Sequence, residues 1–297
     1  MGGIGMAKAL FVLYLIWGFN WVAMKEATLF FPPVLFSCYR FLVGAVVLIG
    51  ITLWCRMPLP PKQYWPWIIV TGLLQIAVNN AAIQIGVTSL GAGLVAVVNY
   101  SMPVWMSILA YFILHETLTK RKILGIVLSM VGMYVLMDVN IVGDITALLL
   151  TIGGAIAWAV AAVIVKYQDK VMHRQQQKET CTMIQYTTWQ IAAGALFLWV
   201  YAMLVEQGQV TWTPMAVSCL AYNGVLASAL AFFLWNYILT KMEASKAGVA
   251  SLGVPVVGVI CNVIFMHEAV HWNTAVGMIL ILAGIFLIVA QRIRQHP

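Results

Sequence analysis

Charge is scarce in this chain: only 8% of its 297 residues are charged, while 63% are hydrophobic. A soluble domain carries roughly 25% charged and about 45–50% apolar residues. The composition therefore excludes a soluble globular protein and predicts an integral membrane protein whose main partner is the lipid bilayer. Long apolar runs without two-residue alternation favour an all-α protein over a β-barrel.

Long polar stretches are also missing, the longest running only from Tyr167 to Thr180. No room is left for a sizeable soluble domain. A spanning helix needs about 20 apolar residues, and the breaks at charges, prolines and polar loops predict ten transmembrane helices. They are expected at residues 7–24, 33–54, 66–86, 90–112, 121–138, 144–165, 181–204, 214–239, 245–265 and 272–290.

Catalytic and energy-coupling groups are absent from the expected spans. All nine acidic residues and all five histidines lie in loops or near span ends, and the five cysteines form no CxxC pair. A carboxylate at mid-membrane, which coupled pumps often use to carry protons, is not found. The sequence also lacks a nucleotide-binding P-loop, HExxH and GxSxG. We therefore expect no metal, no cofactor and no enzymatic activity, and transport without a carboxylate proton relay.

The cations that are present are distributed unevenly. If the N-terminus is cytoplasmic and the ten spans alternate, 14 of the 16 Lys and Arg residues lie on the cytoplasmic side. The positive-inside rule thus predicts cytoplasmic N- and C-termini in a bacterial-type inner membrane. The net charge of +7 then reflects orientation, and no nucleic-acid partner is expected. Only Lys25 and Arg40 lie towards the outside.

A repeat relates the two halves of the chain without a gap. Its members recur at an offset of 152 residues: Pro103, Val104, Ile108, His115, Glu116, Gly125, Leu128 and Gly132 match Pro255, Val256, Ile260, His267, Glu268, Gly277, Leu280 and Gly284. The repeats are predicted at 1–139 and 140–297, with five helices each. Because five is odd, the second copy enters the membrane from the opposite side. Inverted repeats of this kind build transporters that bind substrate at their seam.

Several motifs resemble one transporter family. These are Trp17-Gly18-Phe19-Asn20-Trp21 with Lys25, Pro32-Pro33, Arg40-Phe41, and the two Pro-to-Glu elements that end in His115-Glu116 and His267-Glu268. Together they resemble the drug/metabolite transporter superfamily, in its ten-helix EamA-type branch.

The resemblance implies a secondary transporter that moves a small metabolite, such as an amino acid or an amphipathic organic compound, outward by alternating access. An uptake permease or an exchanger of phosphate-bearing metabolites is the nearest alternative. A membrane enzyme acting on lipid-linked substrates and a non-transporting scaffold are more distant alternatives. A monomer and a homodimer both remain open.

Aromatic and amide side chains within the spans are the candidate substrate ligands. An amide that faces lipid is costly, so these groups are expected to face the bundle interior. Interhelical hydrogen bonding without any ligand would explain them equally well. The candidates are Tyr14, Trp17, Asn20, Trp21, Gln75, Asn79, Asn99, Trp158, Gln185, Trp189, Asn223 and Trp235.

Two further pairs invite a functional interpretation. Lys25 and Arg40 could anchor an anionic group, since guanidinium suits oxyanion recognition. Alternatively, Arg40 forms a structural pair with an acid such as Glu26 or Asp138, or with freed backbone carbonyls. Pro103 and Pro255 delete backbone hydrogen bonds and could act as hinges or as static kinks. The glycines in the fifth and tenth spans predict close packing in a scaffold role.

Overall fold

The computed structural model describes residues 2–90, 92–137, 144–174, 181–206, 208–266 and 271–289, and these ranges contain helices and no strand. The first half contains α1 (Gly2–Ala27), α2 (Pro33–Trp54), the short helix η1 (Lys62–Tyr64), α3 (Trp65–Gly72), η2 (Leu73–Val78), α4 (Asn79–Leu90), α5 (Ala92–Asn99), α6 (Met102–Leu114) and α7 (Lys120–Met137). The second contains α8 (Ile145–Arg174), α9 (Met183–Val205), α10 (Pro214–Ala221), η3 (Tyr222–Leu230), α11 (Ala231–Lys241), α12 (Ala244–Ser251), α13 (Gly253–Met266) and α14 (Trp272–Val289).

Eight helical segments in these ranges are long and apolar enough to cross a membrane. A further segment, Trp272–Ile288, is apolar but shorter. The remaining helix, α7, carries Lys120, Arg121 and Lys122 in its first turn. An all-helical membrane protein is thus confirmed, and the count of ten spans stays a prediction.

Two kinds of irregularity recur at matching places in the two halves. The third expected span contains the π-helix η2, and the eighth contains the π-helix η3. The fourth span is interrupted between α5 and α6, just before Pro103, and the ninth between α12 and α13, just before Pro255. Proline cannot donate the backbone hydrogen bond that a continuous helix requires, so the breaks lie where the sequence predicts kinks. Their use as hinges stays a prediction.

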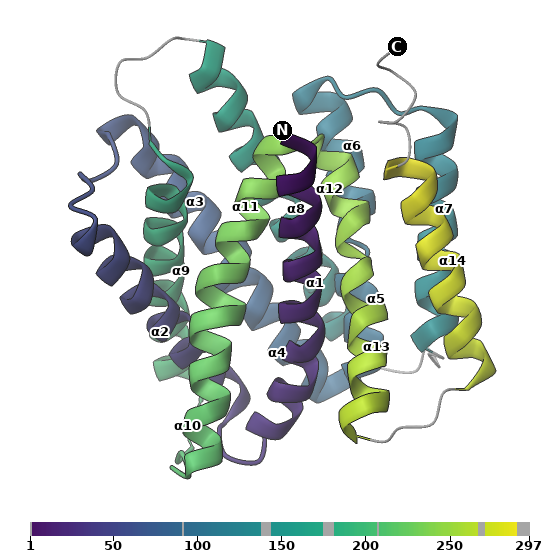
Figure 1. Cartoon of the computed structure of the whole chain (residues 1–297). Helices are drawn as coiled ribbons and strands as arrows, with labels where there is room; N and C mark the ends of the chain where they lie inside the picture. Colours follow the sequence, from purple (N-terminus) through teal and green to yellow (C-terminus); the bar gives the residue numbers. More distant parts are fainter. Residues whose placement is uncertain are drawn as a thin grey trace.

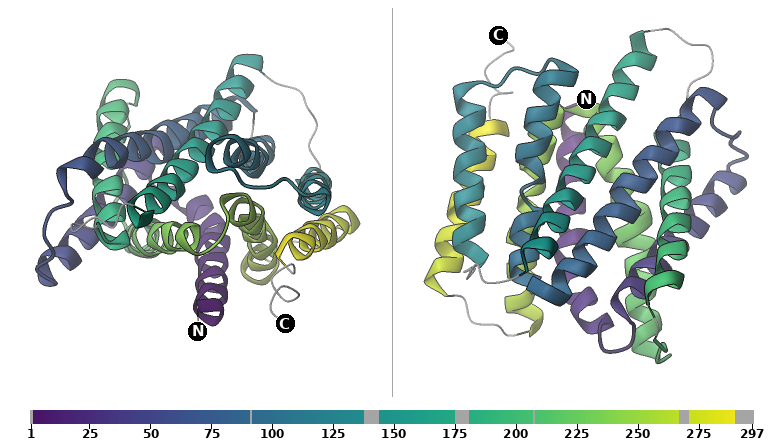
Figure 2. Two further views of the ribbon diagram at one scale, coloured as in Figure 1. Left: turned by 90° about the horizontal axis from the view of Figure 1, so that it is seen from above. Right: turned by 180° about the vertical axis from the view of Figure 1, so that it is seen from behind.

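The repeat relates the helix pairs to one another. If each helix is replaced by its equivalent in the other half, one packed pair becomes another packed pair. Helix α1 packs against α13, and the equivalent helix α8 packs against α6; likewise α2 packs against η3, and α9 packs against α3 and η2. The pairs α2 with α9 and α7 with α14 each join equivalent helices. Figures 1 and 2 show α7 and α14 side by side at one edge of the bundle.

One end of the bundle is rich in lysine, and we call it the basic end. Met6 of α1, Lys166 and Lys170 of α8, Lys241 of α11 and Lys246 of α12 line one cavity there. Because α1 begins and α8 ends at this cavity, the first helices of the two halves run in opposite directions. We call the other end of the bundle, where α1 ends and α2 begins, the opposite end (Figure 1).

Glycines allow α7 and α14 to approach each other closely. A Cβ added to Gly277 would lie 2.6 Å from the carbonyl oxygen of Gly132, and one added to Gly132 would lie 2.8 Å from that of Gly277. Gly125 and Gly284 face each other in the same way. The close packing expected from the glycine spacing is therefore confirmed.

Replacing Gly277 with Val should separate α7 from α14, because backbone atoms of the opposing helix cannot move aside as a flexible side chain can. We expect a loss of about 1–3 kcal/mol, seen as a lowered melting temperature in detergent. Gly153→Ala is the matched control, since a Cβ added there meets nothing within 4 Å. Equal melting temperatures for the two variants would contradict the packing role.

Candidate functional site

A cavity of about 110 Å³ lies among the helices near the middle of the bundle. It extends from the helix breaks at Tyr100 and Ser251 towards Met24, which lies one turn before the end of α1. The cavity therefore occupies the half of the bundle nearer the opposite end. Its lining combines amides, aromatic rings and one guanidinium: Trp17, Asn20, Met24, Arg40, Asn79, Asn80, Ile83, Gln84, Asn99, Tyr100, Met102, Trp158, Phe232, Ser251 and Val254.

Arg40 is the charged group of this cavity. It lies two turns into α2, is only 7% exposed and donates a hydrogen bond from Nη2 to the Asn80 Oδ1 atom at 2.7 Å. The Asn80 amide is itself held by the carbonyl of Ile76 in η2, at 2.7 Å. No carboxylate of the described residues forms an ion pair with Arg40, Glu26 included. Asp138, the other partner considered, lies outside the described residues.

Buried polar atoms at the cavity remain without a protein partner in the described structure. They are Nε of Arg40, a donor, and the Oδ1 atoms of Asn20 and Asn79, both acceptors. A buried polar group without a partner costs about 1–3 kcal/mol. Three residues that line the cavity thus each keep one buried polar atom, a cationic donor or an amide oxygen, without a protein partner.

Aromatic rings close the cavity on the side of the basic end. Trp17 meets Trp158 edge to face, with ring centroids 5.8 Å apart, and also contacts Phe232 at 5.5 Å and Trp235 at 6.1 Å. Trp17 donates from Nε1 to the carbonyl of Ala227 in η3, at 3.0 Å. The two tryptophans come from the first helix of each half, so the seam between the halves passes through this aromatic cluster.

Gln75 fixes the orientation of two of these rings. The Nε1 atoms of Trp158 and Trp235 lie 2.8 and 3.1 Å from the same terminal atom of the Gln75 amide. Because an indole nitrogen only donates, that atom must be the amide oxygen. The other terminal atom faces the Gln190 amide at 2.9 Å, and Gln190 continues the network to Asn236 at 2.8 Å. Gln75 therefore holds in place Trp158, which lines the cavity, and its neighbour Trp235.

Both helix breaks are tied to neighbouring helices. Asn79 donates from Nδ2 to Oδ1 of Asn99, the last residue of α5, at 2.8 Å and to the carbonyl of Gly154 in α8 at 3.0 Å. In the other half, the Tyr14 hydroxyl donates to the carbonyl of Ala250 in α12, at 2.6 Å. The Tyr14 hydroxyl thus satisfies a backbone carbonyl next to the second break, while Asn79 links the side chain at the end of α5 to α8.

Tyr14, Gln75 and Trp235 contact lining residues or neighbouring helices without lining the cavity themselves, and four further candidates lie away from it. Gln185 belongs to the capping box of α9 and donates to the carbonyl of Pro58 at 2.6 Å; Trp189 packs on Trp65 with centroids 5.3 Å apart. Asn223 bonds the carbonyl of Cys219 one turn earlier, at 3.0 Å, and Lys25 is exposed at the end of α1. Trp21 belongs to α1, and its side chain lies outside the described residues.

The basic end is closed by charged side chains. The Glu116 carboxylate accepts hydrogen bonds from the backbone N–H groups of Ala244 and Ser245, at 2.7 and 3.1 Å, and from the Ser245 hydroxyl at 2.6 Å. It therefore caps α12, a helix of the other half. Burial opposes ionisation of Glu243, but hydrogen bonds from Lys122 and Lys246 outweigh burial and lower the pKa of that carboxyl.

Comparison with known proteins identifies this arrangement. The model of the EamA-like transporter family matches the chain twice, over residues 4–138 and 145–290. The chain belongs to the EamA-like transporter family. An uncharacterized transporter of Bacillus subtilis, YoaV, is 30% identical over 92% of each chain. A probable amino-acid metabolite efflux pump of Salmonella typhimurium is 26% identical over 93% of this chain and 92% of its own length.

A solved structure supports the same fold. One crystal structure superposes with a TM-score of 0.80 and covers 98% of this chain and 99% of its own, at 19% sequence identity. The match to the family model confirms the resemblance to EamA-type transporters inferred from the motifs. Within the described ranges, no group of three or more His, Cys, Asp or Glu residues is placed to hold a metal ion.

Some lining residues of this EamA-like transporter were missed from its sequence. Asn80 and Gln84 both lie on α4: Asn80 follows Asn79 directly, and Gln84 lies one turn after Asn80. Gln84 donates a hydrogen bond to the Ser37 hydroxyl at 2.9 Å. The rule that selected Asn79, an amide within a span, selects both of them as well. Phe232, Met24 and Ser251 carry no such signal, because apolar and small side chains are common in every span.

Replacing Gln75 with Leu keeps the approximate volume but removes the acceptor of two indole N–H groups. We expect a loss of about 1–3 kcal/mol for each unsatisfied donor, measured as a lower melting temperature and a lower yield of monodisperse protein. Gln209→Leu, at an exposed position, is the control. A Gln75→Leu variant as stable as the control would show that the network contributes nothing to folding.

Proposed function

We propose that this chain is a secondary transporter that exports a small amphipathic metabolite, with amino acids as the substrate class, across the bacterial inner membrane. The proposal includes ten spans, with α7 and α14 as the fifth and tenth, in two inverted repeats at 1–139 and 140–297. The opposed directions of α1 and α8, and the helix pairs that exchange between the halves, support inversion.

The distribution of cations supports the proposed orientation. The cavity lined by Lys166, Lys170, Lys241 and Lys246 lies at the end where α1 begins. In the cytoplasmic leaflet such cations satisfy the positive-inside rule. The basic end then faces the cytoplasm, both chain termini lie on that side, and the central cavity lies in the outer half of the bundle.

The observation that carries the substrate proposal is Arg40 in the cavity without a carboxylate partner. A substrate carboxylate can accept a charge-assisted hydrogen bond from its guanidinium. The free amide oxygens of Asn20 and Asn79 suit a substrate ammonium group, while Trp17 and Phe232 provide an apolar wall for a side chain. A zwitterion with an apolar side chain matches these three parts. The names of the efflux-pump relatives agree with this class.

In alternating access, the cavity would open first to one end of the bundle and then to the other. The aromatic cluster and the capped basic end separate the cavity from the proposed cytoplasmic face, which supports a conformation closed to the cytoplasm. Inward opening would require α12 to leave Glu116. An uptake permease could use the same geometry, and an exchanger of phosphate-bearing metabolites would place phosphate at Arg40.

Arg40→Gln should separate these substrate classes in proteoliposome flux assays. For an amino-acid substrate we expect KM to rise about 10- to 100-fold, because a charge-assisted hydrogen bond contributes about 1.5–3 kcal/mol. Flux of the corresponding decarboxylated amine should not change. Lys25→Gln, an exposed cation outside the lining, is the control. If Arg40→Gln spares zwitterions and abolishes flux of phosphate esters, the alternative exchanger is correct; equal loss for acid and amine would reduce Arg40 to a structural partner of Asn80.

Transport should not require a proton gradient. The described lining contains no Asp, Glu or His, so no side chain there can pick up and release a proton near neutral pH. We expect substrate flux in liposomes to be unchanged when the proton gradient is removed at a fixed membrane voltage. Collapse of flux under that condition would contradict facilitated transport or exchange.

A further inference from the structure

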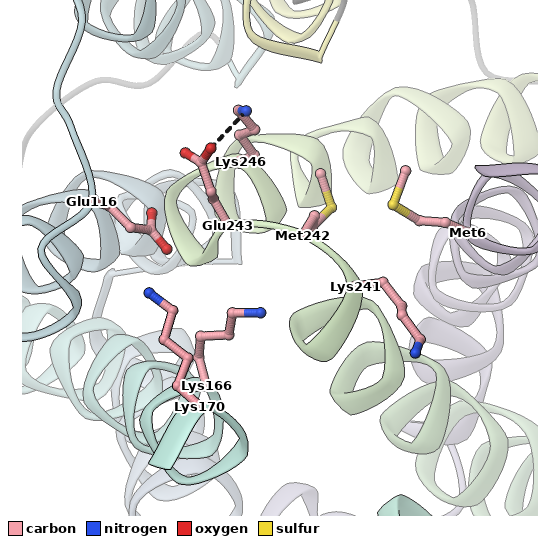
Figure 3. A pocket seen from close by; sticks show the side chains of 8 residues that line it. All are labelled: Met6, Glu116, Lys166, Lys170, Lys241, Met242, Glu243 and Lys246. Atoms are coloured by element: carbon pink, nitrogen blue, oxygen red, sulfur yellow. Dashed lines mark hydrogen bonds and ion pairs between the residues drawn. The ribbon is translucent and has the colours of Figure 1, made fainter. Parts of the chain in front are cut away.

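A second cavity, of about 260 Å³, lies at the basic end and is separate from the central one. Figure 3 shows Lys166 and Lys170 extending from α8 into it, opposite Glu116. The lining comes from α1, α8, α11 and α12, from the connection between α11 and α12, and from the connection between α6 and α7. Its residues are Met6, Glu116, Lys166, Lys170, Lys241, Met242, Glu243 and Lys246. Four cations therefore share this space with two carboxylates.

The two carboxylates are already engaged. Both oxygens of Glu116 accept hydrogen bonds from the first residues of α12. Glu243 is bound by Lys246 at 2.8 Å and by Lys122, which is not part of the lining. Lys166 has only Asp169 at 4.0 Å, while Lys170 and Lys241 form no ion pair with a described residue. The cavity therefore carries an excess of positive charge.

The lysines also keep unused hydrogen-bond donors. Lys166 donates to the carbonyl of Thr240 and Lys170 to that of Leu114, each at 3.1 Å, and these are residues at the ends of α11 and α6. An ammonium group has three donors, so this capping uses only part of its capacity. The carbonyls hold both side chains in extended positions, which lowers the entropy cost of binding a further acceptor. Capping alone explains neither Lys241 nor the number of cations.

We propose that this cavity binds a phosphate group, with Lys166 and Lys170 as direct ligands and Lys241 as a nearby cation. Phosphate provides several acceptor oxygens and negative charge, which match ammonium donors from different helices. Basic pockets between helices at the cytoplasmic side of a membrane commonly bind phospholipid head groups. The same chemistry could come from a lipid head group or from a soluble phosphate. The site does not depend on which solute the central cavity carries.

The test uses the purified full-length chain in zwitterionic nanodiscs and in detergent. Inorganic phosphate binding is measured by titration calorimetry, and retention of phosphatidylglycerol against phosphatidylcholine by native mass spectrometry. Lys170→Gln and Lys241→Gln are compared with Lys62→Gln, an exposed lysine outside this cavity. We expect about fivefold weaker binding for each removed cavity lysine, from about 1 kcal/mol per cation, and no change for Lys62→Gln.

Saturable phosphate binding that weakens in the cavity variants would identify a soluble anion as the ligand. Selective retention of phosphatidylglycerol that weakens in the same variants would identify a lipid head group. Absence of both, or equal binding by the cavity variants and Lys62→Gln, would overturn the proposal. If Lys170→Gln does not fold, Lys241→Gln decides, because the described interaction of Lys241 is a ring contact with Tyr237 at 5.5 Å and its side chain caps no described carbonyl. If a variant still binds phosphate or phosphatidylglycerol but no longer transports, that result bears on the proposed transport function and leaves this site in place.

Discussion

Hydrocarbon cannot accept or donate hydrogen bonds, and every irregular feature of this bundle must therefore be satisfied by its own neighbours. The breaks before Pro103 and Pro255 interrupt two spans at mid-depth. Tyr14 satisfies the carbonyl of Ala250 from an adjacent helix, and Asn79 bonds the side chain of Asn99 at the end of α5. Because these compensating groups converge on one region, the same constraint that permits the breaks also concentrates polarity around a cavity. The site is thus a consequence of how the bundle tolerates its interruptions.

The sequence predicts the large-scale arrangement well, because the position of a span and its capacity for close packing depend on the hydropathy and the small residues of that one helix. Each expected span coincides with a helical segment, and the glycines of α7 and α14 face one another as their spacing indicates. Arg40 stood out as a cation within an apolar run, and it lines the cavity. To predict these features it is enough to know the composition of one helix and the free-energy cost of placing a charge in lipid.

The partners of individual side chains were harder to predict. Gln185 and Asn79 are both amides within expected spans, yet one closes the capping box of α9 and the other lies at the cavity. Position along a span distinguishes them only when the end of the helix is known to within one turn. Glu116 bonds residues 128 and 129 positions later, a contact that depends on how the two halves dock. Helix periodicity gives a face, and tertiary packing decides which neighbour that face meets.

The repeat is symmetric in its scaffold and asymmetric in its chemistry. Trp17 and Trp158 meet across the seam, and the π-helices and breaks recur in both halves. Arg40 has no equivalent cation in α9, and the four lysines of the second cavity all come from the second half. In inverted-repeat transporters a symmetric scaffold makes two opposite-facing states close in energy, and under the proposed mechanism the one-sided charges would make the two states differ in their affinity for anions. A ligand shifts a conformational equilibrium only through its differential affinity for the two states. Under the proposed alternating access, Arg40 and the four lysines of the second cavity are the groups that would make the affinity for an anion differ between those states.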